Sequence, residues 1–172
     1  MIKRACMAGL ALCATTNLMA EPYLGGSIGT VDYGADDIST FEDSTGFEII
    51  IGNKFNKNFA FEASYVDFGE ASDNIPPAFR LDGDTLAFGA LAIAEVDPKL
   101  DVFFKLGLHM WDVSLSADGF GTLATDDGTD VMFGIGATYK PSYDLGFGAR
   151  FNSYDLDGDD ATMLSVYLQA SF

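Results

Sequence analysis

The feature that most constrains the fold is a regular alternation of residue types over the last ten positions of the chain. Alternation with a period of two places one set of side chains on each face of an extended strand. Similar alternation recurs in five further segments, two more are less regular because 22–31 is rich in glycine and 85–94 is apolar on both faces, and no strong helical periodicity follows residue 20. The last ten residues place Leu164, Val166, Leu168, Ala170 and Phe172 on one face, and Met163, Ser165, Tyr167, Gln169 and Ser171 on the other. The other segments are 22–31, 47–55, 59–66, 85–94, 101–111, 131–139 and 145–151. The sequence therefore predicts an all-β chain of eight strands.

Residues 1–20 have a different character. Two basic residues precede a short apolar run and a small residue, Ala20, which is the layout of a secretory signal peptide. The apolar run is too short to cross a bilayer as a helix. We predict cleavage after Ala20, which leaves residues 21–172 as the folded domain, with a lipoprotein signal around Cys13 as the alternative. Cys6 and Cys13 both lie in the signal, so the mature domain would depend on its fold alone for stability.

The acidic residues are concentrated in the longer connections between the predicted strands. The 172-residue chain has a formal net charge of -17, which makes nucleic acid a poor partner. Its hydrophobic fraction of 48% is too high for an acidic disordered protein. Three connections are short turns, and the other four hold 19 of the 26 acidic residues. Those four are 32–45, 67–84, 112–130 and 155–160. We therefore expect a molecule with short turns at one end and long acidic loops at the other.

The less apolar face of the strands distinguishes a soluble sheet from a membrane barrel. A water-facing sheet surface would carry many charges, whereas this face carries mainly small residues, namely Ser64, Gly107, Gly134, Gly136, Gly146 and Gly148. Small residues suit the crowded interior of a narrow barrel, and only closed barrels cross bilayers as strands. Aromatic residues also cluster near the strand ends, as in an interfacial girdle. The predicted fold is an eight-stranded antiparallel transmembrane up-and-down β-barrel with short periplasmic turns and long acidic extracellular loops.

Several stretches resemble the OmpA-like transmembrane domain and related small outer-membrane barrels. They are YLGGSIG in the first strand, KLGLHMWDV in the fifth, LGFGARFNSYD in the seventh, and the C-terminal LSVYLQASF. The resemblance implies a place in the outer membrane of the Gram-negative cell envelope, among outer-membrane lipids and lipopolysaccharide. It also implies that periplasmic chaperones and the barrel-insertion machinery handle the chain, with Leu168, Ala170 and Phe172 as the insertion signal.

Seven polar residues are predicted to face the barrel interior: Glu48, Lys54, Glu62, Lys105, His109, Asp144 and Arg150. Buried charges are costly unless they are paired, so we expect these groups to pair with one another or with trapped water. The resemblance implies that Glu62, Lys105 and Arg150 belong to an interior network that plugs the lumen and can act as a gate. A static salt-bridge core that conducts nothing is the alternative.

No residue pattern calls for catalysis, a cofactor or a tightly bound metal ion. Deacylases of the outer membrane show His-x-Ser on a strand, whereas here Met110 and Trp111 follow His109, the chain's single histidine. The acidic stretches 125–130 and 155–160 lack EF-hand spacing, so at most loose divalent cations are expected there. We expect a structural or surface-interaction role with at most a narrow gated pore. The alternatives are a small porin or OmpW-like channel for small or apolar solutes, and a lipid-modifying outer-membrane enzyme.

Overall fold

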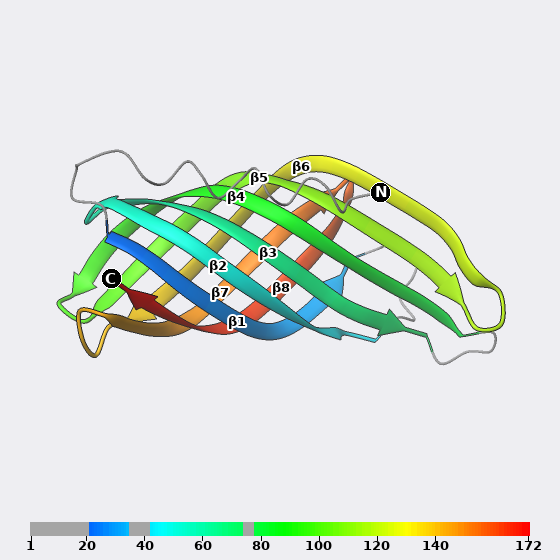
Figure 1. The fold of residues 1–172 in the computed structure, drawn as a ribbon, viewed down its shortest axis with the longest axis horizontal. Coiled ribbons are helices and arrows are strands. Elements are labelled where there is room, and N and C mark those ends of the chain that lie inside the picture. Colours follow the sequence, from blue (N-terminus) through cyan, green and yellow to red (C-terminus); the bar gives the residue numbers. More distant parts are fainter. Residues whose placement is uncertain (1–20, 35–41, 74–77) are drawn as a thin grey trace.

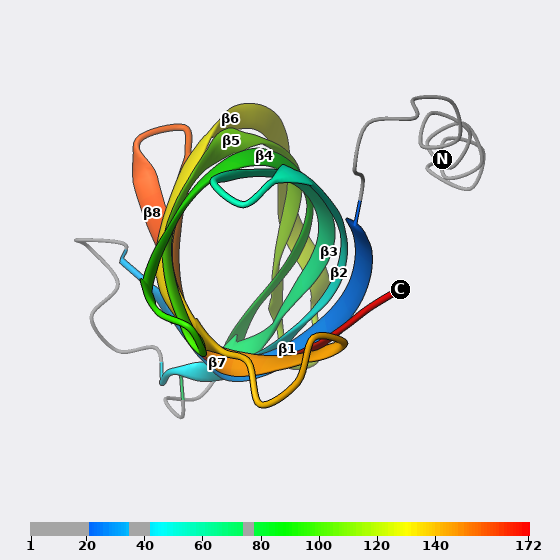
Figure 2. The same ribbon diagram turned by 90° about the vertical axis from the view of Figure 1, so that its left-hand side faces the viewer.

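The computed structural model describes residues 21–34, 42–73 and 78–172, and the predicted signal peptide lies outside them. These residues form eight antiparallel strands, each paired with its neighbours in the sequence, and β1 pairs with β8 to close the ring (Figures 1 and 2). The strands are β1 (Glu21–Tyr33), β2 (Ser44–Asn56), β3 (Phe59–Ser72), β4 (Phe79–Asp97), β5 (Leu100–Ala117), β6 (Gly121–Tyr139), β7 (Leu145–Leu156) and β8 (Asp159–Ser171). No helix in the described part of the chain is long and apolar enough to span a membrane. The predicted closed barrel of eight strands is confirmed.

The short turns lie at the end of the barrel where the chain terminates, on the left of Figure 1. Two of them are stabilised by side chains that accept backbone hydrogen bonds. Asn56 Oδ1 accepts bonds from the amides of Asn58 at 2.8 Å and Phe59 at 3.0 Å. Asp97 Oδ1 accepts one from Lys99 at 3.1 Å. Asn and Asp are common in turns because their side chains can replace a backbone acceptor in this way.

The expected loops at the opposite end are mostly strand. Segment 112–130 forms the end of β5, a turn at 118–120 and the start of β6. Much of 67–84 belongs to β3 and β4, and 155–160 is reduced to a tight turn around Asp157 and Gly158, which have positive φ angles of 57° and 104°. The many Asp and Gly residues conceal strands because both types are depleted in sheets on average. Continuous cross-strand pairing overrides that weak preference here.

The outer surface carries a broad band of exposed apolar side chains, whereas many polar and charged side chains are buried inside the barrel. This distribution is the reverse of a soluble protein and is typical of a transmembrane barrel. Ile49, for example, is 52% exposed, whereas Lys105 is fully buried. The band includes Leu24, Ile28, Ile49, Ile51, Phe61, Phe104, Leu106, Leu108, Phe133, Ile135, Leu164, Val166 and Leu168. The band ends where the outward positions become polar.

The barrel interior is filled in three layers. The layer near the acidic end is the upper apolar cluster, which contains Val31, Val66, Phe68, Ala87, Met132, Tyr154, Ala161 and Met163. The layer near the short turns is the lower apolar cluster, which contains Tyr23, Ile50, Ala60, Leu91, Ile93, Phe103 and Tyr167. Charged side chains lie between the two, as their positions along β2, β3 and β7 require. The interior of the barrel is therefore a packed core.

Candidate functional site

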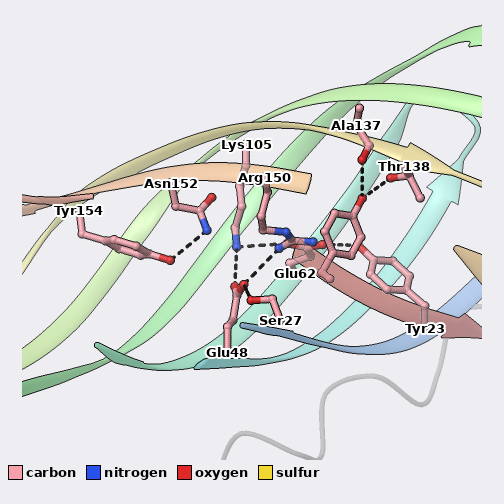
Figure 3. A network of polar contacts seen from close by, with 11 residues as sticks. Tyr23, Ser27, Glu48, Glu62, Lys105, Ala137, Thr138, Arg150, Asn152 and Tyr154 are labelled. Atoms are coloured by element: carbon pink, nitrogen blue, oxygen red, sulfur yellow. Dashed lines mark hydrogen bonds and ion pairs between the residues drawn. The ribbon is translucent and has the colours of Figure 1, made fainter. Parts of the chain in front are cut away.

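Four charged side chains from four strands meet in the middle of the barrel (Figure 3). Glu48 comes from β2, Glu62 from β3, Lys105 from β5 and Arg150 from β7. All four are at most 2% exposed. We call these four residues the charged network. Because side chains alternate between the two faces of a strand, the inward positions identified from the sequence place all four in the lumen.

Each cation of the charged network contacts both carboxylates. Lys105 Nζ lies 3.1 Å from Glu62 Oε2 and 4.0 Å from Glu48 Oε1. Arg150 Nη1 lies 3.3 Å from Glu62 Oε2 and 3.6 Å from Glu48 Oε2. Two acids and two bases balance in charge, so the network as a whole carries no net charge. This balance is what makes burial of four ionised groups tolerable in a low-dielectric interior.

Neutral and aromatic side chains complete the charged network. Tyr23 donates a hydrogen bond from its hydroxyl to Glu62 Oε1 at 2.9 Å, and Ser27 donates one to Glu48 Oε2 at 3.1 Å. The guanidinium carbon of Arg150 lies 4.3 Å from the ring centroid of Tyr167, a cation–π distance. None of these three neighbours was among the predicted site residues. Tyr167 lies on the less apolar face predicted for the last strand, and this position was the sequence feature that could have identified it as an interior residue.

A glycine makes room for Tyr23. A Cβ atom added at Gly52 would lie 2.0 Å from Cζ of the Tyr23 ring, which is impossible without displacing the ring. Gly52 lies directly opposite Tyr23 in the pairing of β1 with β2. Glu62 of β3 pairs with Gly52 on its other side, so the absence of a side chain at Gly52 lets the Tyr23 hydroxyl pass over β2 and reach Glu62.

Three of the predicted interior residues lie outside the charged network, namely Lys54, Asp144 and His109. Lys54 is half-buried near the short-turn end, where its Nζ lies 3.9 Å from Asp101 Oδ2. Lys140 Nζ lies 2.8 Å from the other oxygen of Asp101. The prediction for Asp144 was wrong, because this residue is exposed in the turn at 141–144, before β7 begins at Leu145. Strand alternation does not extend into a turn, so it could not orient Asp144.

His109 lies in the lumen between the charged network and the acidic end. Its Nε2 is 2.9 Å from the carbonyl oxygen of Asp155, and its Nδ1 is 2.9 Å from Thr85 Oγ1. The imidazole also meets the Tyr154 ring edge-on, with centroids 5.3 Å apart. A carbonyl can only accept, so Nε2 donates to Asp155. The ring is fully buried and has a polar partner at each nitrogen, as a structural histidine would.

The predicted insertion signal lies on the outside of the barrel. Leu168, Ala170 and Phe172 are exposed, and Phe172 is 75% exposed. The amide of Phe172 donates to the carbonyl of Pro22 at 3.0 Å, next to the closure of β8 onto β1. Recognition by the insertion machinery stays a prediction. No group of three or more His, Cys, Asp or Glu side chains among residues 21–34, 42–73 and 78–172 could hold a metal ion.

Four aspartates form a row above the apolar band on the outer face. Asp67 of β3 pairs with Asp84 of β4, Asp84 with Asp112 of β5, and Asp112 with Asp127 of β6. Residues directly opposite in a sheet point to the same face, so the four carboxylates lie side by side. We call them the aspartate row. Partial burial raises the pKa of Asp84, and the charges of Asp112, Asp67 and Asp82 raise it further.

Replacing Asp84 by asparagine is expected to increase the free energy of unfolding by about 0.2–1 kcal/mol at pH 7, because like charges directly opposite destabilise a sheet. The folded state holds the Asp84 proton more tightly than the unfolded state does. The penalty is therefore present above the raised pKa and disappears as the pH falls through it. Denaturant unfolding of the native protein and the variant at pH 7 and at acidic pH checks this. An increase in the free energy of unfolding that is the same at both pH values would contradict charge repulsion as the cause.

Comparisons with known proteins agree with this architecture. The model of the outer membrane protein beta-barrel domain family matches residues 5–172. Neisserial surface protein A (NspA) has 13% sequence identity and a TM-score of 0.67, with 89% of this chain and 99% of that chain covered. The N-terminal β-barrel domain of Pseudomonas aeruginosa OprF has 14% identity and a TM-score of 0.64, with 88% and 97% covered. No curated protein has a sequence that matches this chain.

A third solved structure is Ail, the attachment invasion locus protein of Yersinia pestis, in complex with the heparin analogue sucrose octasulfate. It has 13% identity and a TM-score of 0.61, with 89% of this chain and 97% of that chain covered. At such identities the three structures show a shared fold alone. The family match spans nearly the whole chain and places the protein in the bacterial outer membrane, among its lipids and lipopolysaccharide. The chain belongs to the outer membrane protein β-barrel domain family.

Proposed function

We propose that this protein is a sealed outer-membrane barrel whose role is structural and surface-interactive, and that its lumen conducts no solute. The observation that supports this most directly is the layering of the interior. The charged network lies between the upper and lower apolar clusters, so ions entering from either end meet packed apolar side chains. Water and ions cross such a layer only at a high desolvation cost.

Aromatic rings contribute most to the seal on the side of the acidic end. Phe68 of β3 contacts Tyr33 of β1 and Tyr154 of β7, with ring centroids 6.0 Å and 5.2 Å apart in edge-to-face geometry. Tyr154 in turn meets His109 of β5. Phe68, Tyr154 and His109 are fully buried. The rings therefore span the lumen from one wall to the other.

The lumen proposal predicts the outcome of a planar-bilayer experiment. The native protein should give no reproducible openings, whereas replacing both Phe68 and Tyr154 by alanine should produce them. The double replacement removes two large rings from one layer and leaves the charged network in place. Replacing the outward-facing Phe61 by alanine is the matched control and should leave the bilayer silent. Reproducible openings of the native protein, altered by Arg150→Glu, would instead support the narrow-pore alternative.

The barrel exterior supports the surface-interaction part of the proposal. The end opposite the short turns carries the aspartate row together with the exposed Asp82 and Asp126, and Arg80 is already engaged by Asp118 at 2.9 Å. Such an end favours cationic partners, with loose divalent cations among them, and disfavours polyanions. We therefore expect no measurable binding of sucrose octasulfate, the heparin analogue bound by Ail, in calorimetry at physiological salt. Saturable binding would show that the acidic end does not govern partner choice.

We do not assign catalysis to His109, since both of its ring nitrogens already have polar partners in a closed interior. Recognition of Leu168, Ala170 and Phe172 by the insertion machinery and its chaperones forms part of the proposal. It is supported by their exposed positions on the outer face of the closing strand.

A further inference from the structure

The first part of β6 has a partner on one side only. β6 pairs with β5 from Gly121 to Tyr139, but with β7 only from Met132 onward. Within the part of the chain that the structure describes, no strand pairs with residues 121–131 on the β7 side. Figure 1 shows the hairpin of β5 and β6 extending well past the ends of β7 and β8, toward the right of the view. We call residues 121–131 the β6 edge.

At alternate residues of the β6 edge, the backbone groups face a side where none of the described strands pairs with them. The amide of Lys140 donates to the carbonyl of Lys99 at 2.8 Å, and this bond sets which β6 residues are bonded to β5. In an antiparallel ladder the bonded and non-bonded pairs alternate. The register is unbroken from Tyr139 back to Ala124, so the even-numbered residues of this stretch, like Lys140, are bonded to β5. The odd-numbered residues Thr125, Asp127 and Thr129 therefore direct their N–H and C=O groups away from β5. The amide of Asp127 accordingly donates to the neighbouring carboxylate of Asp126 at 3.0 Å.

The β6 edge is strongly acidic. Asp126 and Asp127 lie on it, and Asp112 pairs directly with Asp127. Asp130 faces inward, where it accepts a hydrogen bond from Trp111 Nε1 at 2.8 Å. The sole basic residue in segments 79–84 and 112–131 is Arg80. Its guanidinium forms ion pairs with Asp118, where Nη2 lies 2.9 Å from Oδ1, and with Glu70, where Nε lies 3.6 Å from Oε1. A strand added at this edge therefore meets several carboxylates and no competing cation among the described residues.

Charge also decides between the possible occupants. Pairing with a second copy of the same edge would bring Asp beside Asp, which is destabilising in a sheet. Lipid is a poor fit at the middle of the edge, because the outward residues Thr125, Asp127 and Thr129 are polar. The exposed apolar residues Leu123 and Val131 lie on either side of them. A strand rich in lysine or arginine would satisfy both the backbone groups and the carboxylates.

We propose that the β6 edge binds an extended basic segment of a partner protein, which adds as a further strand beside β6. Backbone hydrogen bonds to Thr125, Asp127 and Thr129 would supply the attachment, and the exposed Asp126 and Asp127 would select basic side chains. The inference deepens the surface-interaction part of the proposed function and rests on it. It does not depend on a sealed lumen, so the bilayer experiment and the binding experiment can fail separately.

The test uses the full barrel in lipid nanodiscs and three fluorescent ten-residue peptides. The first alternates lysine with threonine, the second has glutamate in place of lysine, and the third is the lysine peptide with every amide N-methylated. Fluorescence anisotropy should detect saturable binding of the first peptide alone. Hydrogen exchange should slow at Thr125, Asp127 and Thr129 when it is bound. Equal binding of the methylated peptide would overturn the proposal, because that peptide keeps the charge and has no N–H to donate along either edge.

Variants separate the backbone from the charge. Thr125→Pro removes an edge N–H without removing a bond to β5, and it should abolish binding. Thr125→Val keeps the N–H and should bind like the native protein. Asp126→Asn and Asp127→Asn should each weaken binding by roughly threefold. Native affinity in Thr125→Pro, when its gel mobility still shows a folded barrel, would overturn the proposal. Concentration-dependent self-association that Thr125→Pro abolishes would overturn it in favour of a second copy.

Discussion

Replacing Arg150 by methionine is expected to lower the free energy of unfolding of the barrel by about 3–5 kcal/mol, the cost of leaving a buried charge without its partner. Arg150 Nη1 contacts both Glu48 and Glu62, at 3.6 Å and 3.3 Å. Without it, Lys105 alone faces two carboxylates in a fully buried setting. Reversible guanidinium unfolding in lipid vesicles, followed by tryptophan fluorescence of Trp111, measures the loss.

A double variant shows whether charge balance is the cause. Arg150→Met combined with Glu48→Gln restores equal numbers of acids and bases, so it should be more stable than Arg150→Met alone. Residues in one network couple strongly, and a thermodynamic cycle measures that coupling. Strictly additive losses would mean that Arg150 stabilises the barrel mainly through its packing on Tyr167. A loss below about 1 kcal/mol in the single variant would show that the charged network adds little to stability.

The second large effect concerns the membrane-facing surface. Replacing Ile49 by arginine is expected to cost about 2–4 kcal/mol, since Ile49 lies in the apolar band and is 52% exposed on the outer face. Charged side chains near the bilayer midplane carry that penalty, which falls toward the interfaces. Insertion and unfolding in lipid vesicles provide the measurement.

Thr45→Arg is the matched control for Ile49→Arg. Thr45 is an outward residue of the same strand, four positions closer to the acidic end. Arginine there should cost about 0–1 kcal/mol, because the residue lies beyond the apolar band. Equal costs at the two positions would mean that the membrane boundary does not lie between them.

Individual residues show how far the sequence could predict the site. Glu48, Glu62, Lys105 and Arg150 were identified because each occupies an inward position of an alternating strand. Tyr23 was missed as a partner of Glu62, since nothing near Tyr23 in the sequence indicates a hydrogen bond to a residue 39 positions away. Asp144 was misplaced because its turn follows no periodic rule. Segment 112–130 was predicted as a loop, because it is rich in Asp and Gly, which are depleted in strands on average.

The sequence by itself determined the all-β class, the number of strands, the face of most strands that meets lipid, and the concentration of acid at one end. These properties follow from a local pattern with a period of two. Only the tertiary structure decided which inward charges meet and how the apolar clusters close the lumen on both sides of them. It also decided where β6 extends past the end of β7. Those properties depend on register and strand length, which arise when the ring closes and distant strands come to lie side by side.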